Sequence, residues 1–341
     1  MSWTLNELKT RLEAFLSERA GAPATIAAAR HLTGGASRLT WSIDVEIGGG
    51  AQAGKHAIVL RADMGGNIQE EALTREQEFG LLQVAHAAGV RVPRPRWLCT
   101  DTSVLGVPFF IMDRVEGESV GRRIVREPAL AEARRLLPAQ MGEQLALIHA
   151  LSPPNGLPEP KPGQSPAQTA VEHSTHQLQQ IDEPHPVLEL AIRWLGRHFP
   201  ASASTVLVHG DFRVGNLMVG PGGLCAIFDW EFAHIGDPAE DLAWPCVRSW
   251  RFGQDHLRLG GIGDAEEFFA AYERRSGRKV DCEAVAYWEV MGNLRWAVGC
   301  MVQARRHLSG QSPSLELASL GRRAAEMELE LLRLLEERVG K

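Results

Sequence analysis

Residues 206–241 read VLVHGDFRVGNLMVGPGGLCAIFDWEFAHIGDPAED, and this stretch decides the fold. Short apolar runs at 206–209, 217–219 and 224–228 predict strands, and the turn cluster GPGG at 220–223 predicts a hairpin between the last two. This hairpin folds Asp229 back toward Asn216, and Asp211 lies five residues before Asn216 in the preceding loop. The pattern predicts that three oxygen-bearing side chains converge on one spot.

Two carboxylates and an amide are hard oxygen ligands, which suit Mg²⁺ better than zinc. In phosphoryl transfer, one carboxylate accepts the hydroxyl proton while an Asn and a second Asp hold the metal ions. The order His-x-Asp-x-x-x-x-Asn followed by Asp, found in 209–229, matches this arrangement. Each of these residues alone is also typical of a turn, so the prediction depends on their combination at this spacing.

The motif HGDFRVGN at 209–216, followed by DWE at 229–231, resembles the aminoglycoside phosphotransferase family. These are small-molecule kinases with a protein-kinase-like fold. The resemblance implies an α+β fold of two lobes: a small N-terminal lobe with an antiparallel sheet and a helix, and a larger, mostly helical C-terminal lobe. It also implies site roles: Asp211 as catalytic base, Asn216 and Asp229 as metal ligands, and His209 in the catalytic loop, whose geometry it supports together with Asp241.

Composition fits one enzyme of two lobes. The 341 residues allow an N-terminal nucleotide-binding lobe at 1–115 and a C-terminal catalytic and substrate-binding lobe at 116–341. A formal charge of −6 argues against a dominant nucleic-acid-binding surface. The five cysteines form no CxxC pair, and we find neither a signal core nor an apolar run of about 18 residues. We therefore expect a soluble, cytoplasmic protein without nucleic-acid or membrane partners.

The N-terminal lobe carries the predicted phosphate loop. Alternating apolar and polar residues at 39–47 predict a strand, and 56–62 predict the strand that returns. Just before this hairpin lies TGGASR at 33–38, where small residues let backbone amides approach phosphates. The resemblance implies that Gly34, Gly35 and Ser37 cover the nucleotide phosphates there. The alternative is a flexible entry turn.

The returning strand has Arg61 where a kinase-like fold commonly has Lys. Arg keeps the charge but offers a bidentate fork, so it does not simply replace Lys. A helix predicted at about 69–88 should carry the acidic partner of Arg61, with Glu78 preferred and Glu76 as the rival; the alternative for Arg61 is a surface ion pair. A further strand is predicted at 105–112, and the resemblance implies that the backbone from Asp113 to Val115 meets the adenine.

The C-terminal lobe points to a small acceptor. The interval between Asp229 and DPAED at 237–241 is too short for the activation segment that docks polypeptides in protein kinases. Aromatic residues after it could wall an acceptor pocket, although core packing is the alternative. These are Trp244, Trp250, Trp288, Trp296 and Tyr287.

The segment WRFG at 250–253 and the long tail resemble the family branch that is fused to acyl-CoA dehydrogenases in animals and free-standing in bacteria. This resemblance implies a hydroxylated acyl chain, such as a hydroxyacyl-CoA-like molecule, as acceptor. An antibiotic kinase is the alternative. Aminoglycosides are polycations that need an acidic pocket, and outside the last helix and the 209–216 loop no dense acidic cluster stands out.

The leading prediction is a kinase that depends on ATP and Mg²⁺ and phosphorylates a hydroxyl group of a small molecule. One alternative is a non-catalytic nucleotide-binding protein, which the presence of Asp211, Asn216 and Asp229 disfavours. Another is a metallohydrolase, with a metal cluster drawn from His209, Asp211, Asp229 and His234.

Overall fold

The computed structural model describes residues 3–32, 38–63, 72–181, 183–201 and 204–339. The chain divides into two compact units. The first comprises Met1–Gly117, Leu151–Leu157 and Cys225–Ala233, and the second comprises Glu118–Ala150, Pro158–Leu224 and His234–Lys341. Two short segments that follow Gly117 in the sequence thus belong to the N-terminal unit, and one of them carries Asp229.

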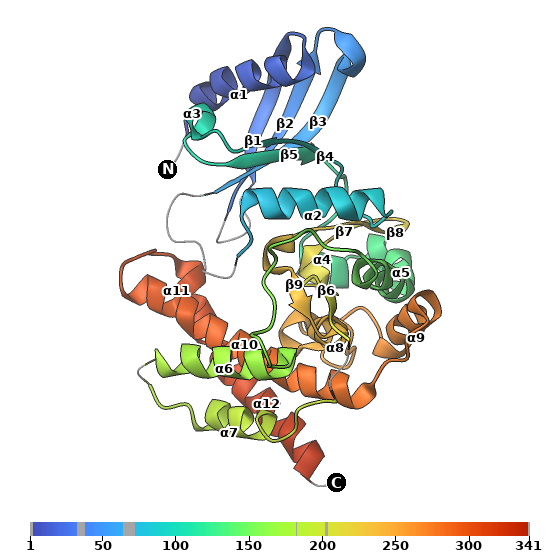
Figure 1. Ribbon diagram of the computed structural model, residues 1–341, viewed down its shortest axis with the longest axis vertical. Helices are drawn as coiled ribbons and strands as arrows, with labels where there is room; N and C mark the ends of the chain where they lie inside the picture. Colours follow the sequence, from blue (N-terminus) through green and yellow to red (C-terminus); the bar gives the residue numbers. More distant parts are fainter. Residues whose placement is uncertain (1–2, 33–37, 64–71, 182, 202–203, 340–341) are drawn as a thin grey trace. The chain divides into compact units, whose positions relative to one another are not determined.

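The first unit is built on a five-stranded antiparallel sheet of order β1-β2-β3-β5-β4 (Figure 1). Its strands are β1 (Ala24–Leu32), β2 (Arg38–Ile47), β3 (Gly54–Asp63), β4 (Pro95–Cys99) and β5 (Phe109–Asp113). Its helices are α1 (Leu5–Ala20), α2 (Arg75–Ala87) and α3 (Thr102–Leu105). The hairpin predicted in this lobe is confirmed, because β2 and β3 pair in continuous register.

The two faces of this sheet pack against different helices. Phe109 of β5 contacts Phe15 of α1, with ring centroids 5.1 Å apart, and the next residue, Phe110, contacts Phe79 of α2 at 5.9 Å. Successive side chains of a strand point to opposite faces. Arg61 of β3 is paired with Phe110 in the register, so it also lies on the α2 face. The sheet therefore presents the charge of Arg61 to α2.

Two element boundaries differ from prediction. Helix α2 begins at Arg75, because the Thr74 side chain accepts the amide of Gln77 and the Gln77 side chain accepts that of Thr74, a capping box that fixes the first turn. Strand β5 begins at Phe109, because 102–105 forms the short helix α3, which ends at Gly106 with φ of 84°. The apolar run at 105–112 suggested one continuous strand, so the short helix was not predicted.

The second unit is mostly helical. Its helices are α4 (Gly121–Arg126), α5 (Ala131–His149), α6 (Pro166–Gln179), α7 (Pro186–Leu195), α8 (Pro238–Ala243), α9 (Ala265–Ser276), α10 (Cys282–Leu308), α11 (Leu315–Gly321) and α12 (Ala324–Val339). The long helix α10 packs against α6, α7, α8, α11 and α12 (Figure 1). A glycine at 142 lets α5 approach α9 closely, because a Cβ there would lie 2.3 Å from the Phe268 carbonyl oxygen.

Short strands hold the 209–216 loop. β6 (Val206–Val208) ends just before it and pairs antiparallel with β9 (His234–Gly236). After the loop, β7 (Leu217–Gly220) and β8 (Gly223–Ile227) form the hairpin predicted from GPGG. Strand β8 begins in the second unit and ends in the first at Ile227, two residues before Asp229.

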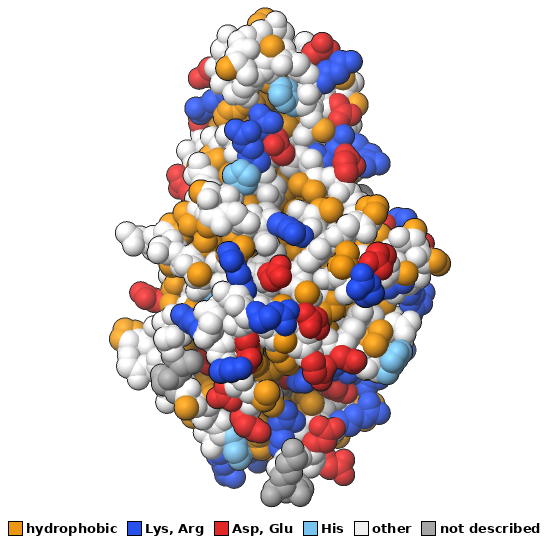
Figure 2. Space-filling view, turned by 90° about the vertical axis from the view of Figure 1, so that its right-hand side faces the viewer, with side chains coloured by type: hydrophobic (Ala, Val, Ile, Leu, Met, Phe, Trp, Pro, Cys, Tyr) orange, Lys and Arg blue, Asp and Glu red, His pale blue; other side chains and the backbone are white. Residues whose placement is uncertain are grey.

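Charged side chains of both signs are interspersed on the face shown in Figure 2, without a large basic patch on that face. Among the helices of the described chain, none is both long enough and apolar enough to cross a membrane.

Candidate active site

Arg61 is held by acidic side chains from two other segments of the first unit. Its Nε lies 3.3 Å from Glu78 Oε1, and its Nη2 lies 2.5 Å from Asp229 Oδ1 and 3.9 Å from Glu231 Oε2. Burial alone would lower the pKa of Arg61, but the negative charges of Glu78, Asp229 and Glu231 outweigh it and raise that pKa. Because Arg61 is buried, the alternative of a surface ion pair is wrong.

The acidic partner of Arg61 on α2 is Glu78, and the rival Glu76 is exposed. Glu78 is only 2% exposed and belongs to the buried face of α2 together with Arg75 and Phe79. Residues three or four apart share one face of a helix, so Glu78 lies with Arg75 and Phe79 on the face that packs on the sheet, where Phe79 contacts Phe110, and Glu76 does not. Which face of α2 packs on the sheet could not be decided from the sequence alone.

Sequence reasoning missed a second buried arginine in this cluster. Arg75 forms an ion pair with Glu78, its Nε lies 3.1 Å from Asp63 Oδ1, and its Nη2 donates to the Leu73 carbonyl at 3.2 Å. Its guanidinium also lies 5.8 Å from the centre of the Phe110 ring. Glu78 therefore bridges two guanidinium groups, one from β3 and one from its own helix. An arginine in the first turn of an expected amphipathic helix gave no signal of burial.

Asp229 adopts a backbone conformation that is uncommon for a residue with a side chain. Its φ is 57° and its ψ is 58°, in the left-handed region that Asp and Asn tolerate better than most residues. The side chain is 38% exposed, although Arg61 contacts one of its oxygens. Next to it, the Glu231 carbonyl accepts the amide of Leu73 at 2.8 Å and ties this segment to the residues before α2.

The cluster around Arg61 carries more negative than positive charge. In its ion pairs, four carboxylates, at positions 63, 78, 229 and 231, meet the two guanidinium groups of Arg61 and Arg75. An excess of carboxylate oxygens next to a partly exposed Asp fits a divalent cation with hard oxygen ligands. The chemistry of these side chains is thus compatible with Mg²⁺, and the role of Asp229 as a metal ligand stays a prediction.

The carboxylate of Asp211 accepts hydrogen bonds from three side chains of the second unit. Arg213 Nε at 2.9 Å and Trp244 Nε1 at 2.7 Å donate to Oδ1. Asn216 Nδ2 donates to Oδ2 at 2.5 Å and to the Asp211 carbonyl at 2.9 Å. Together these bonds fix the orientation of the carboxylate. Asn216 uses its nitrogen on Asp211. Its Oδ1 accepts no hydrogen bond within the described part of the chain, so this oxygen can serve as a metal ligand.

The backbone around Asp211 is fixed by a fully buried acid, Asp241. Its Oδ2 accepts the amide of His209 at 2.6 Å, and its Oδ1 accepts the amide of Gly210 at 3.0 Å. His149 Nε2 lies 3.3 Å from the same Oδ2. Burial would raise the pKa of Asp241, but the hydrogen bond and charge of His149 and the charge and amide of His209 outweigh it and lower that pKa.

His209 is itself completely buried, and its Nδ1 accepts the amide of Asp211 at 3.2 Å. A ring in this position orients the loop from within. We therefore expect His209 to act on the reaction only through Asp211. The predicted catalytic role of His209 thus stays a prediction, limited to orienting Asp211.

The aromatic residues expected to wall the acceptor pocket do not form one group. Trp244, Trp250 and Trp296 pack together, with ring centroids 5.4 Å apart for the first pair and 4.7 Å for the second. Trp244 reaches Asp211, so this cluster is both core and neighbour of the predicted base. Tyr287 instead lines a different cavity of about 690 Å³, bordered by residues of α7, α10 and α12.

Some predicted nucleotide contacts can be placed and others cannot. Gly34, Gly35 and Ser37 lie outside the described residues. The Asp113 side chain forms an ion pair with Arg96 at 2.6 Å, and its amide donates to the Arg94 carbonyl at 2.9 Å, so neither of these groups is left for a nucleotide. The amide of Val115 donates no hydrogen bond to any described residue, as expected of a group kept for a ligand.

The predicted metal ligands belong to different units, Asn216 to the second and Asp229 to the first. Their joint metal site therefore stays a prediction. Within the described residues, no group of three or more His, Cys, Asp or Glu side chains is arranged to hold a metal ion. His234 lies 3.1 Å from Glu240. The described residues thus give no support to the metallohydrolase alternative.

Solved structures assign this architecture to the protein-kinase-like fold. The chain matches a putative aminoglycoside phosphotransferase from Ralstonia eutropha with a TM-score of 0.73 at 25% identity, over 96% of this chain and 98% of that one. It matches a choline/ethanolamine kinase family protein from Mesorhizobium loti with a TM-score of 0.61 at 16% identity, over 96% and 95%. The class is that of the small-molecule kinases.

Residues 30–279 match the model of the phosphotransferase enzyme family, and the chain belongs to this family. It is 29% identical over 292 residues to acyl-CoA dehydrogenase family member 10 of Mus musculus, which covers 79% of this chain but 26% of that protein. It is 30% identical over 242 residues to family member 11 of Homo sapiens, which covers 66% of this chain and 30% of that protein. The chain thus spans about a third or less of the length of these relatives.

Proposed function

We propose that this protein transfers the γ-phosphate of ATP, in the presence of Mg²⁺, to a hydroxyl group of a small molecule. The observation that carries the proposal is the Asp211 carboxylate, oriented by Asn216, Arg213 and Trp244 in a loop that Asp241 holds from below. In this proposal residues 1–115 bind the nucleotide and residues 116–341 provide the base and bind the acceptor.

Asp211 acts as the base that orients the acceptor hydroxyl and takes its proton. Its Oδ1 already accepts two hydrogen bonds, whereas Oδ2 accepts one side-chain bond, from Asn216. A carboxylate oxygen has two lone pairs, so Oδ2 keeps one for the hydroxyl group. Positioned base catalysis of this kind contributes about 10²- to 10⁴-fold in rate.

The residues present fit Mg²⁺ and a nucleotide. Asn216 Oδ1 and the partly exposed Asp229 carboxylate would hold the metal, which when bound supplies charge neutralisation for the transferred phosphoryl group. Arg61, kept in place by Glu78, would contact phosphate together with Gly34, Gly35 and Ser37. The backbone at Asp113 and Val115 would hydrogen-bond the adenine.

For the acceptor we propose a hydroxylated acyl chain, such as a hydroxyacyl-CoA-like molecule. The relatives described above, two acyl-CoA dehydrogenase family members, support this class. An aminoglycoside acceptor is the alternative, because an aminoglycoside phosphotransferase of the same fold is known in a ternary complex with ADP and hygromycin B, with a TM-score of 0.57 at 16% identity. That likeness concerns the fold alone.

The first experiment measures ADP release with ATP and Mg²⁺ across hydroxyacyl-CoAs, aminoglycosides, macrolides, choline and homoserine. We expect one class to stimulate release. Asp211→Asn should lower that rate by about 10²-fold or more, because an amide keeps the shape but cannot take the proton. The exposed Glu132→Gln on α5, which breaks only a surface pair with Arg135, is the matched control.

ATP binding is measured in parallel by fluorescence of a labelled analogue, with and without EDTA. Binding without turnover, for every acceptor and at every Mg²⁺ concentration, would favour the alternative of a non-catalytic nucleotide-binding protein. Turnover of Asp211→Asn at the wild-type rate would remove Asp211 from the role of base.

We also place the protein in the cytoplasm. All five cysteines are free thiols, with Cys99, Cys246 and Cys300 buried and Cys225 and Cys282 exposed. Burial raises the pKa of Cys246 and Cys300 to about 12, which keeps these thiols protonated and unreactive. Free, partly exposed thiols fit a reducing compartment.

A further inference from the structure

Arg213 lies beside the proposed base with most of its donors unused. Its Nε donates to Asp211 Oδ1 at 2.9 Å, and its guanidinium lies 4.3 Å from the centre of the Trp250 ring. The two terminal amino groups donate to no other residue in the described part of the chain. The side chain is 22% exposed. A guanidinium that lies over an aromatic ring, with free amino groups next to the proposed catalytic carboxylate, is arranged to bind an oxyanion.

The glycine at 215 makes room for this side chain. A Cβ at Gly215 would lie 2.2 Å from Arg213 Nη1, whereas the backbone there does not have the positive φ that requires glycine. The space taken by the guanidinium thus explains this residue. Gly215 and Asp211 together fix where the amino groups of Arg213 lie.

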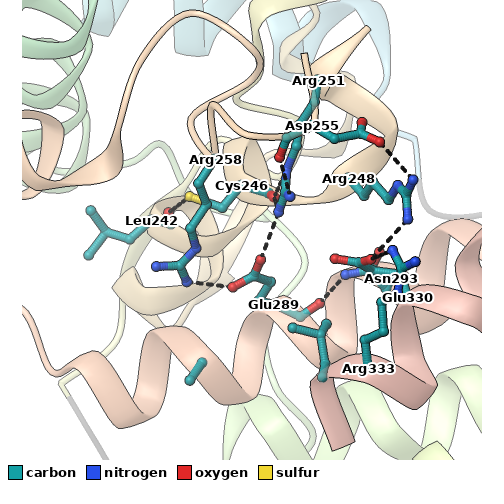
Figure 3. A network of polar contacts seen from close by, with 12 residues as sticks. Leu242, Cys246, Arg248, Arg251, Asp255, Arg258, Glu289, Asn293, Glu330 and Arg333 are labelled. Carbon is teal, nitrogen blue, oxygen red and sulfur yellow. Dashed lines mark hydrogen bonds and ion pairs between the residues drawn. The ribbon is translucent and has the colours of Figure 1, made fainter. Parts of the chain in front are cut away.

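Trp250, the platform under Arg213, belongs to a segment that ion pairs hold against two helices. We call residues 244–262 the tryptophan segment; Figure 3 shows the ion pairs that tie it to α10 and α12. Glu289 of α10 is 2% exposed and lies 3.3 Å from Arg251 Nη2 and 2.5 Å from Arg258 Nη2. Arg248 Nη1 lies 3.3 Å from Glu330 Oε2 of α12.

The tryptophan segment is also packed tightly on the 209–216 loop. A Cβ at Gly260 would lie 2.5 Å from Val214 Cγ2. Phe252 adopts the left-handed conformation with φ of 47°, and its ring fills the place of a Cβ at Gly121. A non-glycine residue held in this conformation needs surrounding contacts that over-determine it. Contacts with α10, α12, α4 and the 209–216 loop thus hold the segment that carries Trp250.

From this arrangement we infer that Arg213 binds the phosphoryl group in transit to the acceptor hydroxyl. The inference rests on the proposed function. As the acceptor oxygen forms its bond to phosphorus, the bond from phosphorus to the bridging oxygen breaks and ADP leaves with the electron pair. The hydroxyl proton passes to Asp211. Both terminal amino groups of Arg213 hydrogen-bond oxygens of the phosphoryl group during this step, and Asp211 and Trp250 hold the guanidinium in place.

The test uses ADP, Mg²⁺ and aluminium fluoride, a mimic of the phosphoryl group in transit that needs no identified acceptor. Thermal unfolding of the full chain is measured with ADP·Mg²⁺ alone and with the fluoride added. We expect the fluoride to add a further rise in Tm for the wild type. Arg213→Met should keep the ADP shift and lose the further rise, and Arg213→Lys should retain part of it because the charge remains but the fork does not.

Turnover is measured with the acceptor that the panel identifies and with water as acceptor. We expect Arg213→Met to lower kcat by about 10²- to 10³-fold, the range for one oxyanion donor, with nucleotide affinity unchanged. Gly215→Ala should lower kcat without removing the arginine. The control is Arg193→Met, which changes an exposed arginine of α7 that pairs with Glu189.

The outcomes separate this inference from the proposed function. A wild type that binds no nucleotide contradicts the proposed function itself. A wild type with the fluoride-dependent rise, matched by an equal rise in Arg213→Met, overturns the role of Arg213 and leaves the kinase intact. An increase of KM confined to anionic acceptors, with the fluoride rise preserved, would assign Arg213 to a charge on the acceptor and also overturn the inference. If Arg213→Met does not fold, the fluoride-dependent rise in Tm of Arg213→Lys and the kcat of Gly215→Ala decide whether Arg213 has this role.

Discussion

At the residue scale, the predicted site depends on buried charges that have several partners each. Glu78 bridges Arg61 and Arg75, and Asp241 bridges two backbone amides and His149. Removing one member of such a set leaves the others buried without full compensation, which costs more than the set contributes. This gives two predictions at single positions.

Glu78→Gln should lower the free energy of unfolding by about 3 kcal/mol, because it leaves two buried guanidinium groups short of charge. Glu76→Gln, two residues earlier on the same helix, should change it by less than about 0.5 kcal/mol, because Glu76 is exposed. Urea denaturation of both variants measures the difference. Equal effects of the two substitutions would contradict the assignment of Glu78 as the partner of Arg61.

Asp241 should make stability depend on pH on the acid side. Because its pKa is lowered in the folded chain, its contribution is present above its unfolded-state pKa of about 3.9 and is lost as the pH falls from there through the lowered folded-state pKa. Asp241→Asn should reduce stability at neutral pH and flatten this acid-side loss, since an amide does not ionise. Thermal unfolding between about pH 2 and pH 7 measures both profiles, and parallel profiles would exclude Asp241 as their source.

At the element scale, helix α10 carries the segment that reaches the proposed base. A Cβ at Gly292 of α10 would lie 2.8 Å from Val247 Cγ2 and 3.3 Å from Trp244 Cε3, whereas a Cβ at Gly299 of the same helix would meet nothing within 4 Å. The first glycine is thus a contact point for the tryptophan segment. The second serves no packing purpose that the structure shows.

Gly292→Ala should destabilise the protein by about 1 kcal/mol or more through overpacking, and it should reduce turnover because Trp244 donates to Asp211. Gly299→Ala should stabilise by about 0.5–1 kcal/mol, since alanine favours a helix interior and nothing obstructs it. Denaturation midpoints and kcat of the two variants test this pair. Loss of turnover in both would mean that α10 acts in another way than through Trp244.

The limits of prediction from sequence are also clearest at this scale. Asp211 and Asn216 lie five residues apart in a loop between strands, so local spacing was enough to predict that they meet. That Asp229 joins them stays a prediction, because the structure assigns Asp229 to the first unit, where Arg61 contacts it. The choice between Glu78 and Glu76 required knowing which face of α2 packs on the sheet, and an error of one residue in the helical phase turns that face by about 100°.

Long-range polar contacts were beyond sequence reasoning. Trp244 was considered for a wall of the acceptor pocket, with core packing as the alternative, and its hydrogen bond to Asp211 spans a separation that no periodicity encodes. Arg75 and Arg213 gave no signal in the sequence, because the burial of Arg75 and the contact of Arg213 with Trp250 depend on residues far along the chain.

At the scale of the whole molecule, the two-lobe α+β prediction is confirmed by the kinase-like structures that the chain matches. The sequence could predict this because the deciding motif is local and the apolar–polar alternation of β2 is clean. It could not predict that 151–157 and 225–233 would cluster with the first unit, since compactness depends on tertiary contacts.

The distribution of thiols offers a way to follow the whole molecule in solution. Cys225 belongs to the first unit and Cys282 to the second, and both are exposed, while the other three thiols are buried. The unaltered chain can therefore carry one spin label or fluorophore on each unit without any engineered cysteine. Distances between such a pair, recorded with and without nucleotide, would report directly on any rearrangement of the two units during turnover.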